Sequence, residues 1–172
     1  MKKIVLIGYM GSGKSKIGEN ISKNIGIPFY DLDEIIENVE QDTIKNIFQA
    51  KGEVFFRKKE SVVFREFLNN NDNFILALGG GTSCYANNHE LLNQDGVVSI
   101  YLKASIATLV ERLSKEKSKR PLIAHLNDAE LEDYIRKHLF DRGYYYLQAK
   151  HTVAVDNKSV KEISAEIENL LA

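Results

Sequence analysis

Five short apolar runs are spaced along the chain, and segments with the periodicity of helices lie between them. The runs cover about residues 3–8, 28–31, 73–78, 97–102 and 151–156. In the first interval Ile17, Ile21 and Ile25 recur every four residues, as on one face of a helix. This alternation predicts an α/β fold with a parallel sheet and right-handed crossovers. Ligands of such a sheet bind at the carboxyl ends of its strands.

The same patterns give the bounds of the expected helices. The first runs from Lys14 to Ile25. Asp42 is expected to cap a helix over 43–50, which breaks at Gly52 before a second helix over about 53–68. Further helices are predicted over about 104–115, 128–150 and 159–171.

A phosphate-binding loop follows the first predicted strand. Residues 8–15 read G-Y-M-G-S-G-K-S, which is a complete G-x-x-x-x-G-K-[ST] pattern. Its glycines let backbone N–H groups turn inward around phosphate oxygens, and a helix after Gly13 adds the positive end of its dipole. Lys14 offers a charge to the β- and γ-phosphates, and the Ser15 hydroxyl is a hard oxygen suited to Mg²⁺. The loop therefore predicts that the chain binds a nucleoside triphosphate.

Two carboxylates follow the second predicted strand, in Asp31-Leu32-Asp33. Residues two apart on an extended chain point to the same side, so both carboxylates could face one site. One could support Mg²⁺ through water, and the other could orient or deprotonate a hydroxyl group. The alternative is that Asp31 or Asp33 caps a helix starting at Glu34.

Three further segments carry candidate chemistry. The glycines at 79–81 follow a strand and could bring backbone N–H donors close to a ligand, or could form a plain turn. Arg120 ends a basic stretch between two helices, which could close over phosphates or be a solvated face. Arg57 is an exposed helix residue unless Glu60, three positions on, holds its guanidinium group in place. The neighbouring Phe48, Phe55 and Phe56 are expected in the core.

Composition limits the remaining possibilities. The 172 residues are 44% apolar, which suits one domain over 1–172. A net charge of −1 gives no general attraction to nucleic acid or to acidic membranes, and no apolar stretch reaches 18 residues. One cysteine, Cys84, excludes an intramolecular disulfide and is expected to be a small buried residue. The four histidines have no metal-ligand spacing. We expect a cytoplasmic monomer without nucleic-acid or membrane partners.

Together these segments resemble the shikimate kinases, a P-loop family similar to the nucleoside-monophosphate kinases. The resemblance covers essentially the whole chain and rests on an ordered set of motifs: the loop at 8–15, Asp31-x-Asp33, the segment from Phe48 through Gly52-Glu53 and Phe56-Arg57 to Glu60, the triple glycine, and Arg120-Pro121-Leu122. It implies a three-layer P-loop kinase fold whose five-stranded parallel sheet is flanked by helices. It also implies a substrate-binding segment over about 32–62 and a mobile lid over about 115–127.

The activity implied by the resemblance is transfer of the ATP γ-phosphoryl group to the 3-hydroxyl of shikimate, on the route to chorismate and the aromatic amino acids. Asp31 would support Mg²⁺ through water beside Ser15, and Lys14, Asp33 and Arg120 would be catalytic. The nucleotide would be bound by Gly11, Ser12, Gly13, Lys14, Ser15, Lys16 and Arg120. Shikimate would be bound by Asp33, Arg57, Gly79, Gly80, Gly81 and Arg142.

Two positions depart from the family pattern. Lys16 stands where the family usually has threonine after the loop. Arg142 keeps the family register if Tyr146 matches the family tyrosine, and it is one residue out of register if Tyr145 does. Arg112 and the turn at 157–158 are candidates for contacts with the adenine base.

Two other functions fit parts of the sequence. A kinase for another small polyol, such as gluconate, would keep Lys14 and Ser15 but would not need two carboxylate-binding arginines. A regulator that binds nucleotide without catalysis is the second alternative, because the loop alone predicts only binding.

Overall fold

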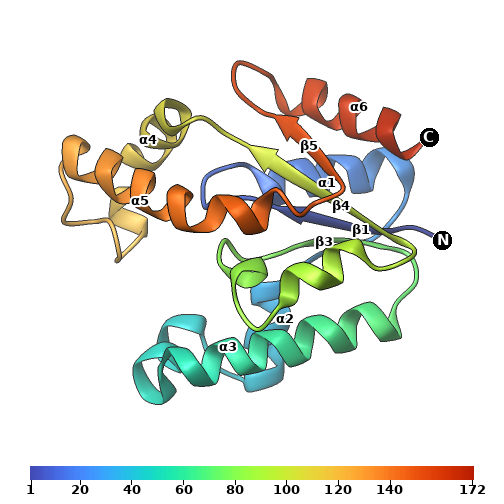
Figure 1. Ribbon diagram of the computed structural model, residues 1–172, viewed down its shortest axis with the longest axis horizontal. Helices are drawn as coiled ribbons and strands as arrows, with labels where there is room; N and C mark the ends of the chain where they lie inside the picture. Colours follow the sequence, from blue (N-terminus) through green and yellow to red (C-terminus); the bar gives the residue numbers. More distant parts are fainter.

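The computed structural model describes residues 1–172, and a five-stranded sheet flanked by helices forms its centre (Figure 1). Neighbouring strands all run parallel, in the order β2-β3-β1-β4-β5. The α/β prediction with a five-stranded parallel sheet is therefore confirmed. The strands are β1 (Lys3–Ile7), β2 (Phe29–Asp31), β3 (Phe74–Ala77), β4 (Val97–Lys103) and β5 (His151–Ala154).

The helices pack in pairs around this sheet: α1 against α6, α2 against α3, and α4 against α5 (Figure 1). No helix is both long enough and apolar enough to cross a membrane. The α-helices are α1 (Lys14–Ile25), α2 (Leu32–Glu40), α3 (Ile44–Asn70), α4 (Ile106–Ser114), α5 (Asp128–Tyr146) and α6 (Val160–Leu171). Three short 3₁₀ helices, which the apolar pattern does not predict, are η1 (Thr82–Cys84), η2 (Asn88–Asn93) and η3 (Lys117–Lys119).

The start of α3 differs from the prediction by one residue. Thr43, not Asp42, is the N-cap, and its hydroxyl accepts a hydrogen bond from the Asn46 N–H at 3.1 Å. The Asp42 carboxylate instead accepts from the Thr43 N–H at 2.8 Å, outside the helix. Both residue types are good caps, so their order alone does not decide which one begins the helix. The predicted break at Gly52 is a kink inside α3, with φ 82° and ψ 172°.

The start of α2 separates the roles of the two aspartates. The helix begins at Leu32 rather than Glu34, and Asp31 is its N-cap. The Asp31 Oδ1 accepts from the Asp33 N–H at 2.9 Å. The capping interpretation therefore holds for Asp31 and is wrong for Asp33, whose carboxylate accepts none of the hydrogen bonds in the structure.

The remaining helices begin or end a few residues from the predicted bounds. Ser105 caps α4, and α5 ends at Tyr146 because the chain must turn before β5. The core is centred on β1, where Ile4, Val5 and Leu6 are fully buried, as expected for a central parallel strand covered on both faces.

Strand order determines which loops can form a site. Because β2, β3 and β1 are adjacent and parallel, the segments after their carboxyl ends lie side by side. These segments are Asp31-x-Asp33, the glycines at 79–81 and the loop at 8–15. Motifs that are separated along the chain therefore meet at one edge of the sheet.

Candidate active site

The phosphate-binding loop connects the end of β1 to the start of α1. Gly11 and Gly13 have φ values of 82° and 100°, a region that side chains with a Cβ rarely adopt. Gly13 is the N-cap of α1 and no side chain caps it, so the first N–H groups of the helix remain available to an anion. Lys14 Nζ donates to the carbonyl oxygens of Gly8 at 2.6 Å and Tyr9 at 3.1 Å. The lysine is thus held within its own loop, beside the place where phosphates would bind.

Ser15 faces the end of β2. Its hydroxyl donates to Asp31 Oδ2 at 3.4 Å, which brings two hard oxygen ligands together at the edge of the loop. An alcohol and a carboxylate with space for water are the donors that Mg²⁺ takes in nucleotide sites. The residues present therefore fit a magnesium ion.

Lys14 and Asp33 have opposite charges and pKa values shifted toward neutrality. Burial lowers the pKa of Lys14 to about 8, against the opposing effect of the Asp33 and Asp31 carboxylates. Burial raises the pKa of Asp33 to about 6, and the nearby carboxylates of Asp31 and Glu60 add to the rise. Asp33 is therefore an ionised, partly desolvated carboxylate at neutral pH, which is suited to accept a hydrogen bond from a hydroxyl group.

Each of the three glycines after β3 faces a different charged side chain. A Cβ at Gly79 would lie 3.1 Å from Asp33 Oδ1, and one at Gly80 would lie 3.4 Å from an Arg142 guanidinium nitrogen. A Cβ at Gly81 would come within 2.8 Å of the Arg57 guanidinium group. The glycines thus allow one carboxylate and two guanidinium groups to converge on three residues of backbone, a close approach that larger residues would obstruct.

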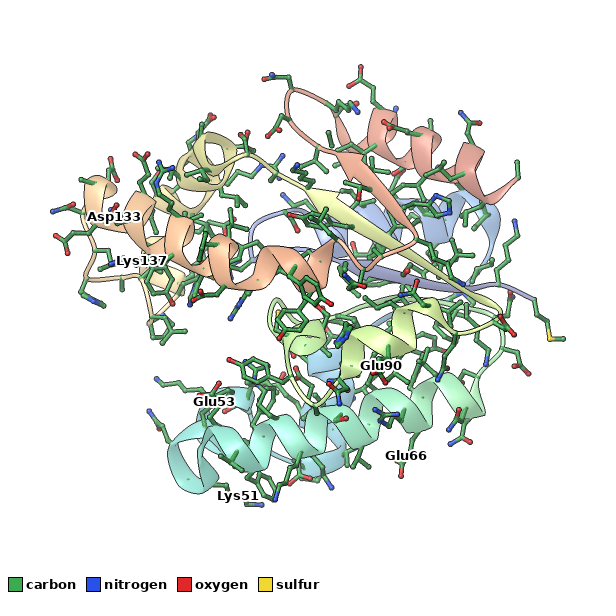
Figure 2. The ribbon with its side chains drawn as sticks, in the orientation of Figure 1. Lys51, Glu53, Glu66, Glu90, Asp133 and Lys137 are labelled. Atoms are coloured by element: carbon green, nitrogen blue, oxygen red, sulfur yellow. The ribbon has the colours of Figure 1, made fainter.

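Arg57 is held from several sides. One of its terminal nitrogens donates to Glu60 Oε1 at 2.9 Å, as the sequence spacing predicted. Its guanidinium carbon lies 4.1 Å from the centre of the Tyr85 ring, a cation–π contact. Its Nε lies 3.6 Å from Glu53, on the preceding turn of α3. In Figure 2 the labelled Glu53 marks the part of α3 that carries Arg57. The labelled Asp133 and Lys137 mark α5, the helix that carries Arg142.

Arg142 is positioned by the helix turn that contains Tyr146. Tyr146 is 1% exposed, whereas Tyr144 is 65% exposed, so the third tyrosine of the run is the one that packs inward. Its hydroxyl donates to the Gly80 carbonyl oxygen at 2.5 Å. Arg142, four residues earlier on the same helix face, reaches the same glycine.

A cavity of about 580 Å³ extends from the glycines along the loop toward α6. Arg112 borders it and donates to the carbonyl oxygens of Gly11 and Ser12 at 3.0 and 3.2 Å. Arg57, Arg142 and Gly81 do not line this cavity; Arg142 lies beside Gly80, which does line it, and Arg57 lies beside Gly81. The predicted site residues that line it are Gly11, Ser12, Gly13, Lys14, Ser15, Lys16, Asp31, Asp33, Gly79, Gly80 and Arg120.

The basic segment before α5 also reaches the cavity, and it is better anchored than its sequence suggests. Arg120 lines the cavity and pairs with Glu116 at 3.2 Å. Lys117 pairs with Asp128 at 3.3 Å, and Ile123 is fully buried. Ile123 is the apolar side chain that anchors the segment, whereas Leu122 is 71% exposed.

Two contacts near the site were not predicted. The Tyr9 hydroxyl lies 2.7 Å from His138 Nδ1 and ties the phosphate-binding loop to α5. The Thr82 hydroxyl donates to Glu60 Oε2 at 2.8 Å. The position of Thr82 directly after the glycines was a signal that it lies near the site, but no pattern pairs it with Glu60. No group of three or more His, Cys, Asp or Glu side chains that could hold a metal ion is present.

This combination defines the class of protein. A phosphate-binding loop after the central strand, in a parallel sheet of order 2-3-1-4-5 with charged groups converging beside it, is the construction of a P-loop kinase. The comparisons with known proteins narrow the class. A family model described as shikimate kinase matches residues 10–172, and the chain belongs to the shikimate kinase family.

Individual relatives agree over the full length. A shikimate kinase of Flavobacterium johnsoniae is 55% identical over 172 residues, which is 100% of both chains. One of Flavobacterium psychrophilum is 53% identical over 171 residues, with 99% of each chain covered. The crystal structure of shikimate kinase from Bacteroides thetaiotaomicron has a TM-score of 0.91 at 30% identity, covering 99% of this chain and 98% of that one. Shikimate kinase from Acinetobacter baumannii in complex with shikimate has a TM-score of 0.86 at 32% identity, covering 99% and 93%.

Proposed function

We propose that this chain transfers the γ-phosphoryl group of ATP to the 3-hydroxyl of shikimate, giving shikimate 3-phosphate and ADP for the synthesis of chorismate and aromatic amino acids. The observation that carries the proposal is the convergence of Asp33, Arg142 and Arg57 on three consecutive glycines beside the phosphate-binding loop. A small acid with several hydroxyl groups fits this arrangement. The two guanidinium groups bind the substrate carboxylate, and the Asp33 carboxylate accepts from the reacting hydroxyl group. Residues 1–172 act in this proposal as one catalytic domain.

The nucleotide phosphates bind along the loop. Backbone N–H groups from Gly11 to Lys16 surround the phosphate oxygens, as the open N-terminus of α1 favours. Lys14 exchanges its two carbonyl partners for the transferring phosphoryl group. Ser15 and Asp31 would hold Mg²⁺ at this place, with Asp31 supporting the ion through water. The ion, when bound, neutralises charge on the β- and γ-phosphates.

Shikimate binds with its carboxylate toward Arg57 and Arg142 and its reacting hydroxyl toward Asp33. The three glycines form the backbone between these groups, and their small size permits the substrate ring to lie against them. Two planar guanidinium groups fixed by separate helices fit a carboxylate better than mobile lysines would. This arrangement favours an acid over a neutral polyol.

Asp33 orients the attacking hydroxyl and accepts its proton as the new bond forms. The pKa of about 6 keeps Asp33 ionised at neutral pH yet close enough to neutrality to take a proton. Because phosphoryl transfer has a loose transition state, most of the rate enhancement comes from alignment and charge stabilisation. Proton acceptance by Asp33 is then a late event.

Arg120 completes the charge around the transferring group. Its present partner, Glu116, lies 3.2 Å away at the cavity wall, and Arg120 exchanges that partner for phosphate when the nucleotide binds. Closure of the lid over 115–127 also excludes water that would otherwise hydrolyse ATP.

The test is the initial rate of ADP release from ATP and Mg²⁺ with shikimate, with gluconate and with no acceptor. Release with shikimate and near-background rates in the other two reactions are expected. Release with gluconate alone would identify a polyol kinase, and no release with either acceptor would favour a nucleotide-binding regulator. Both of these results would contradict the proposal.

A further inference from the structure

A buried carboxylate links the substrate-binding arginine to the segment after the glycines. Glu60 is 1% exposed, and burial of a charged carboxylate is costly unless both of its oxygens have partners. One oxygen accepts from Arg57 at 2.9 Å. The other accepts from the Thr82 hydroxyl at 2.8 Å. The carboxylate is therefore fixed by α3 on one side and by η1 on the other.

Thr82 is itself held by a chain of buried hydrogen bonds. Its carbonyl oxygen accepts from Asn88 Nδ2 at 2.9 Å, and Asn88 Oδ1 accepts from the Ser61 hydroxyl at 2.8 Å. Ser61 follows Glu60 on α3, so the chain of contacts closes into a loop between α3, η1 and η2. Thr82 and Asn88 are fully buried, which leaves water no access to compete for these bonds.

We propose that Thr82 is a positioning residue for shikimate recognition, because its hydroxyl fixes the Glu60 carboxylate in the orientation that holds Arg57 against the third glycine. The proposal rests on the proposed function, in which Arg57 binds the substrate carboxylate. A carboxylate with a partner on one oxygen alone can rotate, and the Arg57 fork would rotate with it. Arg57 already lies close to Gly81, where a Cβ would come within 2.8 Å, so a small rotation changes where the fork points.

The hydroxyl group is the feature that matters at this position. Valine has nearly the same shape as threonine but cannot donate a hydrogen bond, whereas serine keeps the donor and loses a methyl group. Thr82→Val should raise the dissociation constant and the KM for shikimate about tenfold, which corresponds to about 1.4 kcal/mol. The KM for ATP should stay within about twofold, because Thr82 does not line the nucleotide cavity. Thr82→Ser should restore shikimate binding to within about threefold of the wild type.

The experiment measures shikimate binding by calorimetry and both KM values by ADP release, in the wild type, Thr82→Val and Thr82→Ser. Thr82→Ala, which adds no bulk, replaces the valine variant if that protein does not fold. Ser99→Ala is the matched control, since it removes another fully buried hydroxyl, one that donates to the Leu92 carbonyl oxygen away from the site. The control should lower stability and leave shikimate affinity unchanged.

A double variant shows whether the effect passes through the arginine. In an Arg57→Ala background, Thr82→Val should cause no further loss of shikimate affinity, because the group that it positions is gone. Equal shikimate affinity in wild type and Thr82→Val would overturn the positioning role, as would equal losses in the valine and serine variants or an additive loss in the double variant. Absence of shikimate-dependent ADP release in the wild type would overturn the proposed function as well, so the two failures are distinguishable.

Discussion

Replacing Asp33 by asparagine should make the protein more stable and much less active. Asn has the same shape but no charge, and the Asp33 carboxylate accepts no hydrogen bond that the substitution would disturb. The helix cap is also retained, because Asp31 provides it. The ionised carboxylate is therefore a cost to folding that function requires.

The size of the effect follows from the pKa of Asp33. Burial, with Asp31 and Glu60 nearby, raises it from 3.8 to about 6. Since one pKa unit corresponds to about 1.4 kcal/mol, the folded state at pH 7.5 is destabilised by up to about 3 kcal/mol relative to a neutral side chain. Because the pKa of Asp33 is higher in the folded state than its ordinary value of 3.8, Asp33 favours folding most at pH values below 3.8. That stability is lost as the pH rises through about 6. The gain in Asp33→Asn should therefore fall to roughly half at pH 5.

The assay is urea unfolding followed by circular dichroism at pH 7.5 and pH 5, with EDTA and without nucleotide. Asp33→Asn should have a higher free energy of unfolding at pH 7.5, an unchanged m-value and a turnover reduced by at least about a hundredfold. Asp42→Asn, a carboxylate at an exposed turn, is the control without an expected gain. Stability equal to wild type at pH 7.5, or the same gain at both pH values, would refute the argument from burial. Near-normal turnover would refute the catalytic role.

Four further outcomes are expected. Lys14→Met should abolish phosphoryl transfer in the ADP-release assay and leave the circular dichroism spectrum unchanged. Lys14 lies within the loop, and its charge is the one that the loop offers to the transferring phosphoryl group. Arg57→Ala should weaken shikimate binding by about 2–5 kcal/mol in calorimetry with little change for ADP, and Arg57→Lys should also bind poorly. Arg120→Ala should lower kcat more than shikimate affinity, and amide exchange over 117–127 should slow when ADP and shikimate bind. In wild type, kcat/KM for shikimate should fall as the pH drops below about 6, where Asp33 gains a proton.

Each of these has a result that would contradict it. Turnover by Lys14→Met, or equal shikimate affinity in Arg57→Ala and wild type, would remove that side chain from its proposed role. Equal amide protection with and without ligands would mean that the 117–127 segment is a static loop. A flat kcat/KM profile between pH 5 and pH 7.5 would mean that Asp33 does not titrate in the free enzyme.

The sheet and the phosphate-binding loop were predictable because their signals are local. Apolar runs marked each strand to within one or two residues, and the loop glycines at 11 and 13 have the backbone angles that their pattern implies. The meeting of Asp33 with the triple glycine also followed, since adjacent parallel strands bring their carboxyl ends together.

The supporting contacts were not predictable, because they join distant residues. Thr82 and Glu60 are 22 residues apart, and Tyr9 and His138 are 129 apart. Such pairs depend on how each helix is rotated about its axis, which packing of the whole domain decides. The tyrosine run at the end of α5 shows the same limit: three identical side chains give no sign that Tyr146 is the one that packs inward.

The most direct test of the central claim is identification of the product. ATP, Mg²⁺ and shikimate are incubated with the protein, and the products are identified by mass spectrometry and by phosphorus–proton correlated NMR. We expect one shikimate monophosphate for each ADP formed, with the phosphorus coupled to the proton on carbon 3. ADP without phosphorylated shikimate, or a phosphoryl group on another hydroxyl, would contradict the site proposed around Asp33 and the three glycines.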